Sequence, residues 1–101
     1  PTFAREFGMA VGCETWPFQA TGERRELHAS GAAPILVVGT TGDPATPYEW
    51  SVRLAEQLES AELLTWEGEG HTAYGRAGRC VDEVVERYLL EGVLPEGGAS
   101  C

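Results

Sequence analysis

Two side chains in this sequence are of types that together catalyse proton transfer: Asp43, in the segment GTTGDP, and His71, in the segment EGEGH. A carboxylate that accepts the Nδ1 proton of a histidine fixes its tautomer and stabilises the imidazolium that forms when Nε2 takes a proton from a nucleophile. The ordinary imidazole pKa, about 6.5, lies near working pH and suits this base role. Taken singly, Asp43 before a proline could be only a turn or cap residue, and His71 only an exposed loop histidine. The pair has chemical meaning if the fold brings both side chains together.

The residues around Asp43 and His71 predict a strand, a helix and a second strand. The run ILVV at 35–38 is apolar on both faces and stops at a glycine, which is typical of a short strand in a parallel sheet. Thr46 and Pro47 suit the N-cap and the first position of a helix. Apolar residues then recur at every fourth position before Ser60: Trp50, Leu54 and Leu58. The segment AELLTW at 61–66 predicts the second strand.

A strand, a helix and a strand of these lengths form a unit whose two strands are parallel and usually adjacent. Asp43 follows the first predicted strand by five residues, and His71 follows the second by five. Both therefore emerge at the carboxyl edge of the sheet, where open α/β sheets bind ligands. Because neighbouring strands lie only ~5 Å apart, the Asp43 carboxylate is expected within reach of the His71 ring.

Two further segments predict helices outside this unit. Residues 3–14 place apolar side chains on one helical face before Pro17, so we expect a helical segment over 1–18 and a solvated connector over 19–33. Residues 78–90 carry a full apolar stripe, with Gly92 as the stop and Pro95 preventing resumption. The stripe consists of Val81, Val84, Val85, Tyr88 and Leu89. The expected fold class is α/β, with residues 34–101 forming the strand, helix, strand, helix segment and a parallel strand pair.

The composition excludes several classes of function. Sixteen acidic residues against seven basic ones give a net charge of -9, which would repel nucleic acid. No stretch approaches the roughly 18 to 20 continuous apolar residues of a membrane span. Three cysteines lack CxxC spacing and form no metal-binding pattern with the two histidines, so we expect no metal and no cofactor. In an oxidising environment, an odd cysteine count allows at most one internal bridge.

At Asp43 and His71 the chain resembles the α/β-hydrolase superfamily, whose triad runs in the order serine, acid, histidine. The segment PILVVGTTGDPATP resembles the acid loop of that family, and LLTWEGEGHTAYG resembles its histidine loop. More narrowly, CETWP and CVDEVVERYLLEGVLPEGGASC resemble the C-terminal region of actinobacterial tripeptidyl-aminopeptidase-like exported proteases. The resemblance runs from about residue 12 to residue 101. It implies that Asp43 is the triad acid and His71 the general base.

The chain departs from the family pattern because it has no GxSxG nucleophile elbow. Its serines lie in contexts without a strained strand-to-helix turn: Ser30, Ser51, Ser60 and Ser100. We therefore expect a C-terminal part of a secreted or cell-envelope serine peptidase, inactive alone, with the serine upstream. Its expected partners are the remainder of its own hydrolase polypeptide, or another copy through self-association, and a peptide substrate. The alternatives are a non-catalytic α/β binding or structural subunit, and an esterase of the same fold.

The resemblance also implies a disulfide between Cys80 and Cys101, which would close a loop of about 20 residues and contribute roughly 3 kcal/mol. Two free thiols are the alternative. For Cys13, the resemblance suggests a bridge to an upstream portion, and a buried unpaired cysteine is the alternative.

Overall fold

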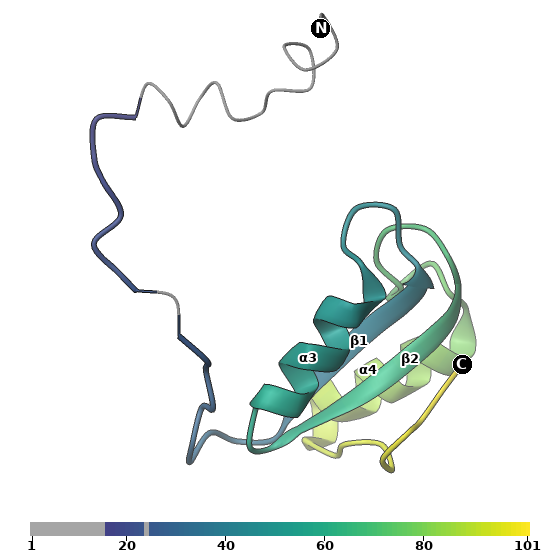
Figure 1. Cartoon of the computed structure of the whole chain (residues 1–101). Coiled ribbons are helices and arrows are strands. Elements are labelled where there is room, and N and C mark those ends of the chain that lie inside the picture. The colour runs from purple at the N-terminus through teal and green to yellow at the C-terminus, as the bar shows by residue number, and fades with distance from the viewer. Residues whose placement is uncertain (1–15, 24) are drawn as a thin grey trace, which may run out of the picture.

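The computed structural model describes residues 16–23 and 25–101. Its elements run in the order β1 (Ile35–Gly42), α3 (Tyr48–Gln57), β2 (Ala61–Glu69) and α4 (Arg79–Glu91). The two strands are parallel neighbours, which confirms the α/β class and the parallel pair (Figure 1). The helix expected over 3–14, and with it most of the segment 1–18, lies outside the described residues.

The described residues between 16 and 34 form neither helix nor strand, and all of them are exposed. This stretch leads away from the sheet in Figure 1. Its last part is fastened to the turn after α3, because the Glu59 amide donates to the His28 carbonyl at 2.9 Å and the Ile35 amide donates to the Ser60 carbonyl at 2.9 Å. These hydrogen bonds therefore fix the position of the chain at the start of β1.

Both strands are longer than predicted. The sequence pattern ended them at Val38 and Trp66, whereas the pairing continues to Gly42 and Glu69. Gly39 is part of β1 and pairs with Thr65. The helix α3 packs directly on it, since a Cβ atom there would lie 2.9 Å from the Ser51 Cβ. Glycine in a strand often marks such a close approach of another element, so the prediction that Gly39 ends the strand was wrong.

The two helices cover opposite faces of the strand pair. On one face, a buried cluster of Leu64, Ala73 and Val81 joins β2 to α4. On the other face, the Tyr48 hydroxyl of α3 lies 2.7 Å from the Thr65 hydroxyl of β2. Because successive strand residues point to opposite faces, Leu64 and Thr65 face different helices. Figure 1 shows the strands between α3 and α4.

The start of α3 differs from the expectation in a way that concerns Asp43. The N-cap position is Pro47, without a side-chain cap bond, and the helix ends at Gln57 rather than near Ser60. Thr46, predicted as the N-cap, instead donates its hydroxyl proton to the Asp43 carboxylate at 2.8 Å. The N-cap prediction for Thr46 was therefore wrong, because a nearer carboxylate takes its hydroxyl.

The last helix matches its prediction closely. It spans Arg79–Glu91, and Gly92 adopts the left-handed conformation as its C-cap, with its amide donating to the Tyr88 carbonyl at 2.8 Å. Only glycine takes that conformation without steric cost. The Tyr88 hydroxyl also donates to the Pro34 carbonyl at 2.8 Å, so the helix is attached to the start of β1.

The C-terminal tail runs along the outer side of β2. The Thr65 amide donates to the Ala99 carbonyl at 3.0 Å, and the Cys101 amide donates to the Thr65 carbonyl at 2.8 Å. The expected bridge between Cys80 and Cys101 is present and ties the end of this tail to α4. The tail is therefore held from both the strand and the helix.

Replacing Cys80 and Cys101 together by serine is expected to lower the free energy of unfolding by about 3 kcal/mol, because the unfolded chain loses a cross-link across 21 residues. Denaturant titration measures this loss, and hydrogen exchange should show faster exchange at the backbone amides of positions 65 and 101. Cys13→Ser, which keeps both bridged cysteines, is the control. Unchanged exchange at Thr65 in the double variant would contradict the role given to the bridge.

Candidate active site

Asp43 and His71 meet at the carboxyl edge of the strand pair. Asp43 directly follows β1 and His71 comes two residues after β2, closer to the strands than the five residues expected. The last two paired positions are Thr40 with Trp66 and Gly42 with Glu69. Between these two pairs, β2 contains one residue more than β1. This irregularity redirects the end of β2 as it enters the histidine loop.

The two side chains are in direct contact. The Nδ1 atom of His71 lies 3.0 Å from Oδ2 and 3.1 Å from Oδ1 of Asp43. The ring therefore faces both carboxylate oxygens at hydrogen-bonding distance. The positions of Asp43 and His71 after successive strands predict that they share one edge of the sheet, and the structure brings them together there.

The Asp43 carboxylate also accepts hydrogen bonds from the loop that follows it. Its Oδ1 accepts the backbone amides of Ala45 at 2.8 Å and Thr46 at 2.9 Å, and its Oδ2 accepts the Thr46 hydroxyl at 2.8 Å. Its side chain is only 6% exposed. Asp43 is thus a turn residue and a histidine partner at once, so the two interpretations weighed from the sequence are compatible.

These contacts keep the carboxylate ionised. The Thr46 amide contributes most to lowering the pKa of Asp43, burial opposes it, and the Ala45 amide, the Thr46 hydroxyl and His71 lower it further. The resulting pKa of Asp43 lies well below its ordinary range. Donors that bond the charged form of a carboxylate have this effect. Asp43 therefore presents a negative charge to His71 across the neutral and mildly acidic range.

His71 is held by a loop with unusual backbone geometry. Gly70 has a φ of 120° and Thr72 a φ of 68°. A positive φ is a genuine outlier for a β-branched residue. The Thr72 amide donates to Oδ2 of Asp43 at 3.5 Å, and the Gly70 amide donates to the Gly42 carbonyl at 3.2 Å. The strain at Thr72 is thus located beside the acid and the base.

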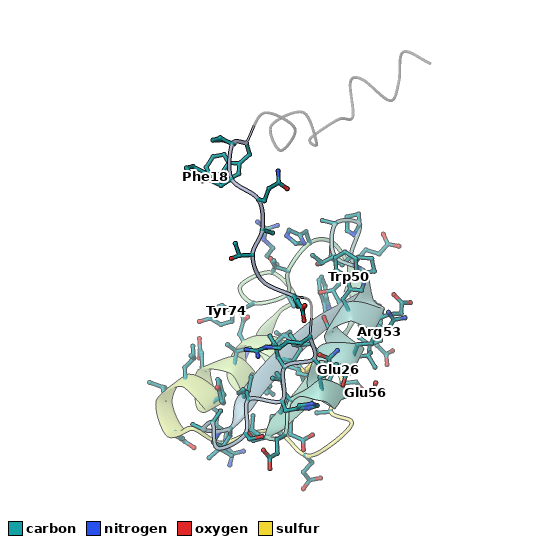
Figure 2. The ribbon with its side chains drawn as sticks, turned by 60° about the vertical axis from the view of Figure 1, so that its left-hand side comes forward. Phe18, Glu26, Trp50, Arg53, Glu56 and Tyr74 are labelled. Carbon is teal, nitrogen blue, oxygen red and sulfur yellow. A yellow bond between two sulfur atoms is a disulfide. The ribbon has the colours of Figure 1, made fainter. Side chains whose placement is uncertain are left out.

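The residues after Thr72 fix this loop to the core. Ala73 is buried, and its carbonyl accepts the amides of Arg76 and Ala77 at 3.0 and 2.8 Å. The Gly75 amide donates to Oδ1 of Asp82 at 2.7 Å, which joins the loop to α4. Next to Ala73, the exposed Tyr74 side chain projects outward (Figure 2). Thr72 and Ala73 were not predicted as site residues, since neither a lone threonine nor a lone alanine in a loop carries a distinguishing pattern in the sequence.

The opposite side of the His71 ring is accessible. Its side chain is 52% exposed, and within residues 16–23 and 25–101 no side chain is hydrogen-bonded to Nε2. A cavity of about 270 Å³ opens beside Asp43, and five hydroxyl-bearing residues contribute to its wall: Thr40, Thr46, Ser51, Thr72 and Tyr74. No serine of the described segments is hydrogen-bonded to His71, Ser51 included. The arrangement can therefore accept a proton from a group that approaches from outside these segments.

In the part of the chain that the structure describes, no three His, Cys, Asp or Glu side chains gather as a metal site requires. Across the same residues, no helix combines the length and apolar character needed to cross a bilayer.

Comparison with known proteins gives a consistent set of relatives. The family model described as "TAP-like protein" matches residues 1–101. The chain is 44% identical over 89 residues to the serine protease Hip1 of Mycobacterium tuberculosis, and 44% identical over 89 residues to a carboxylesterase B of the same species. It is 31% identical over 94 residues to a tripeptidyl aminopeptidase of Streptomyces lividans. These alignments cover 88%, 88% and 92% of the chain but only 17%, 17% and 18% of the relatives.

The lowered pKa of Asp43 predicts how its contribution to stability depends on pH. Because the folded-state pKa lies below the unfolded value of about 3.9, the ionised carboxylate stabilises the fold above pH ~4, and this stabilisation disappears as the pH falls toward the folded-state value. Asp43→Asn should therefore be less stable than the wild type at pH 7, and the difference should narrow below pH ~4.

Denaturant titrations between pH 3 and pH 7, a range chosen to span the ordinary carboxyl pKa of about 3.9, measure this difference. Glu49→Gln, which removes an exposed carboxylate from the first turn of α3, controls for the general effect of charge. A stability difference that stays constant down to the lowest pH would contradict the assignment.

Proposed function

This chain belongs to the TAP-like family of α/β-hydrolases, and from that membership we propose that it forms the C-terminal part of a longer serine hydrolase. In that enzyme Asp43 is the triad acid and His71 the general base. The observation that carries this proposal is the contact of Nδ1 with both carboxylate oxygens while the other side of the ring is accessible.

In the proposed reaction, Nε2 of His71 takes the proton from a serine hydroxyl as the serine oxygen attacks the substrate carbonyl. The imidazolium that forms lies against the ionised Asp43 and is stabilised by it, and it then gives the proton to the leaving group. Asp43 itself does not take up the proton in this scheme, in keeping with its lowered pKa. The carboxylate also holds neutral His71 as the Nδ1–H tautomer, so that Nε2 is available as the base.

The nucleophile and the oxyanion hole are proposed to come from a preceding part of the same polypeptide. Two features support this. The described residues offer no serine to Nε2, and the chain spans only 17% of the length of the serine protease it matches. The remaining polypeptide, or a second copy of this chain, would also cover apolar side chains that are now exposed.

These exposed side chains lie on both helices. Trp50 of α3 is 59% exposed, and Leu89 and Leu90 of α4 are 67% and 84% exposed. Trp50 projects from α3 together with the charged Arg53 and Glu56 (Figure 2). Contact with another protein surface would remove these apolar side chains from water, which supports the proposed association with the remainder of the hydrolase.

The proposed substrate is a peptide, cleaved by an exopeptidase of the tripeptidyl-aminopeptidase type. The relatives named as a serine protease and a tripeptidyl aminopeptidase support this choice. An esterase is the second candidate, because the relative named carboxylesterase B is as similar as the protease, at 44% identity. The same acid and base serve either reaction, since both proceed through attack on a carbonyl. The disulfide supports a secreted or cell-envelope location, where oxidised cysteines persist.

In the full-length hydrolase, Asp43→Asn is expected to lower kcat by as much as ~10⁴, because the amide no longer selects the reactive tautomer. His71→Ala should abolish proton transfer to a similar degree. Steady-state hydrolysis of a chromogenic tripeptide anilide measures both effects, with Glu49→Gln and His28→Ala as matched controls. Near-normal turnover in Asp43→Asn would remove Asp43 from the mechanism, and near-normal turnover in both variants would favour a non-catalytic role for this segment.

The choice between peptidase and esterase rests on a second comparison in the same enzyme. The tripeptide anilide, the same anilide with a blocked amino terminus, and a short-chain p-nitrophenyl ester are assayed side by side. A higher kcat/KM for the free tripeptide than for the blocked one is expected of the proposed exopeptidase. Turnover of the ester alone, lost in Asp43→Asn, would replace the peptidase by the esterase.

A further inference from the structure

Thr46 gives the Asp43 carboxylate two hydrogen bonds, one on each oxygen. Its amide donates to Oδ1 at 2.9 Å and its hydroxyl donates to Oδ2 at 2.8 Å. Because a single residue holds both oxygens, the carboxylate plane cannot rotate without breaking one of these bonds. That plane is the one that presents both oxygens to Nδ1 of His71, at 3.1 and 3.0 Å.

The Thr46 hydroxyl also lies 3.5 Å from Nδ1 of His71. A hydroxyl has one proton, and here that proton is directed to Oδ2 of Asp43. Nδ1 therefore faces two carboxylate oxygens and a hydroxyl lone pair, none of which offers it a proton. This surrounding favours the tautomer with hydrogen on Nδ1 and disfavours the tautomer with a bare Nδ1.

The Thr46 hydroxyl does not cap the adjacent helix α3. Pro47 is the N-cap of α3 and no side chain caps that helix, although the sequence pattern predicts the cap at Thr46. The side chain thus serves the carboxylate.

We propose that Thr46 is a positioning residue for the acid–base pair: its hydroxyl locks the Asp43 carboxylate in the orientation that holds His71 as the Nδ1–H tautomer. The inference rests on the proposed roles of Asp43 and His71. Thr46 acts through Asp43, to which it donates both hydrogen bonds.

The test uses the full-length hydrolase with Thr46→Val and Thr46→Ser. Valine keeps the shape and the backbone amide but removes the hydroxyl, so kcat should fall by roughly tenfold, the change that one lost transition-state interaction of ordinary strength produces, while KM stays within about twofold of the wild type. Thr46→Ser restores the hydroxyl and should recover most of the lost kcat. In histidine-selective ¹⁵N spectra, the valine variant should show a smaller Nδ1–H population for His71.

Thr41→Val is the matched control. The Thr41 hydroxyl lies at the same rim, donating to the Gly68 carbonyl at 3.3 Å and accepting the Gly68 amide at 3.2 Å, but it does not contact the carboxylate. Thr41→Val leaves every hydrogen bond to the Asp43 carboxylate in place, so kcat and the His71 spectrum should stay near wild type. If Thr46→Val does not fold, Thr46→Ala takes its place.

The outcomes separate this inference from the function on which it rests. Wild-type kcat and tautomer population in folded Thr46→Val, with Asp43→Asn inactive, would overturn the positioning role and leave the triad assignment intact. A loss in Thr46→Ser as large as that in Thr46→Val would also overturn it, because the hydroxyl would then not be the cause. Near-normal turnover in Asp43→Asn would instead overturn the proposed function.

Discussion

The parallel register of β1 and β2 is the constraint on which the rest of the site depends. Pairing of Gly42 with Glu69 places the residues that follow each strand at one rim, separated by about the strand spacing of ~5 Å. A slip of one residue would turn every side chain of a strand to the opposite face, so the register is held by burial of Leu64 against α4 and by contact of Thr65 with α3. Packing on both faces thus determines where an acid and a base can meet.

Asp43 and His71 differ in how far their side chains are buried. Asp43 is nearly enclosed and bonded on both oxygens by its own loop, whereas about half of the His71 side chain is open to solvent. A fixed charge beside an accessible ring suits a base that must receive a proton from a separate group and return it. The positive φ of Thr72 belongs to the same arrangement, because backbone strain is retained where the surroundings impose it and often accompanies a functional site.

The sequence predicted the order of the described strands and helices, the parallel pairing and the meeting of Asp43 with His71, because these follow from apolar periodicity and from the geometry of crossovers. The predictions were wrong where one residue type at a given position is compatible with two local structures. Gly39 could end a strand or admit a helix, and only the position of α3 decides between them. Thr46 before Pro47 could cap a helix or hold a carboxylate, and the nearness of Asp43 decides that case. Ala73 has no pattern of its own, since its burial depends on how the histidine loop folds against β2 and α4.

The C-terminal tail has a consequence for how this sheet can grow. At Thr65 both backbone groups on the outer side of β2 are already bonded to the tail, and the disulfide keeps that tail from swinging away. A new strand cannot pair there without first displacing a covalently tethered one. Among the described residues the outer edge of β1 carries no such tail, so a further strand would pair on that side without displacing a tethered segment.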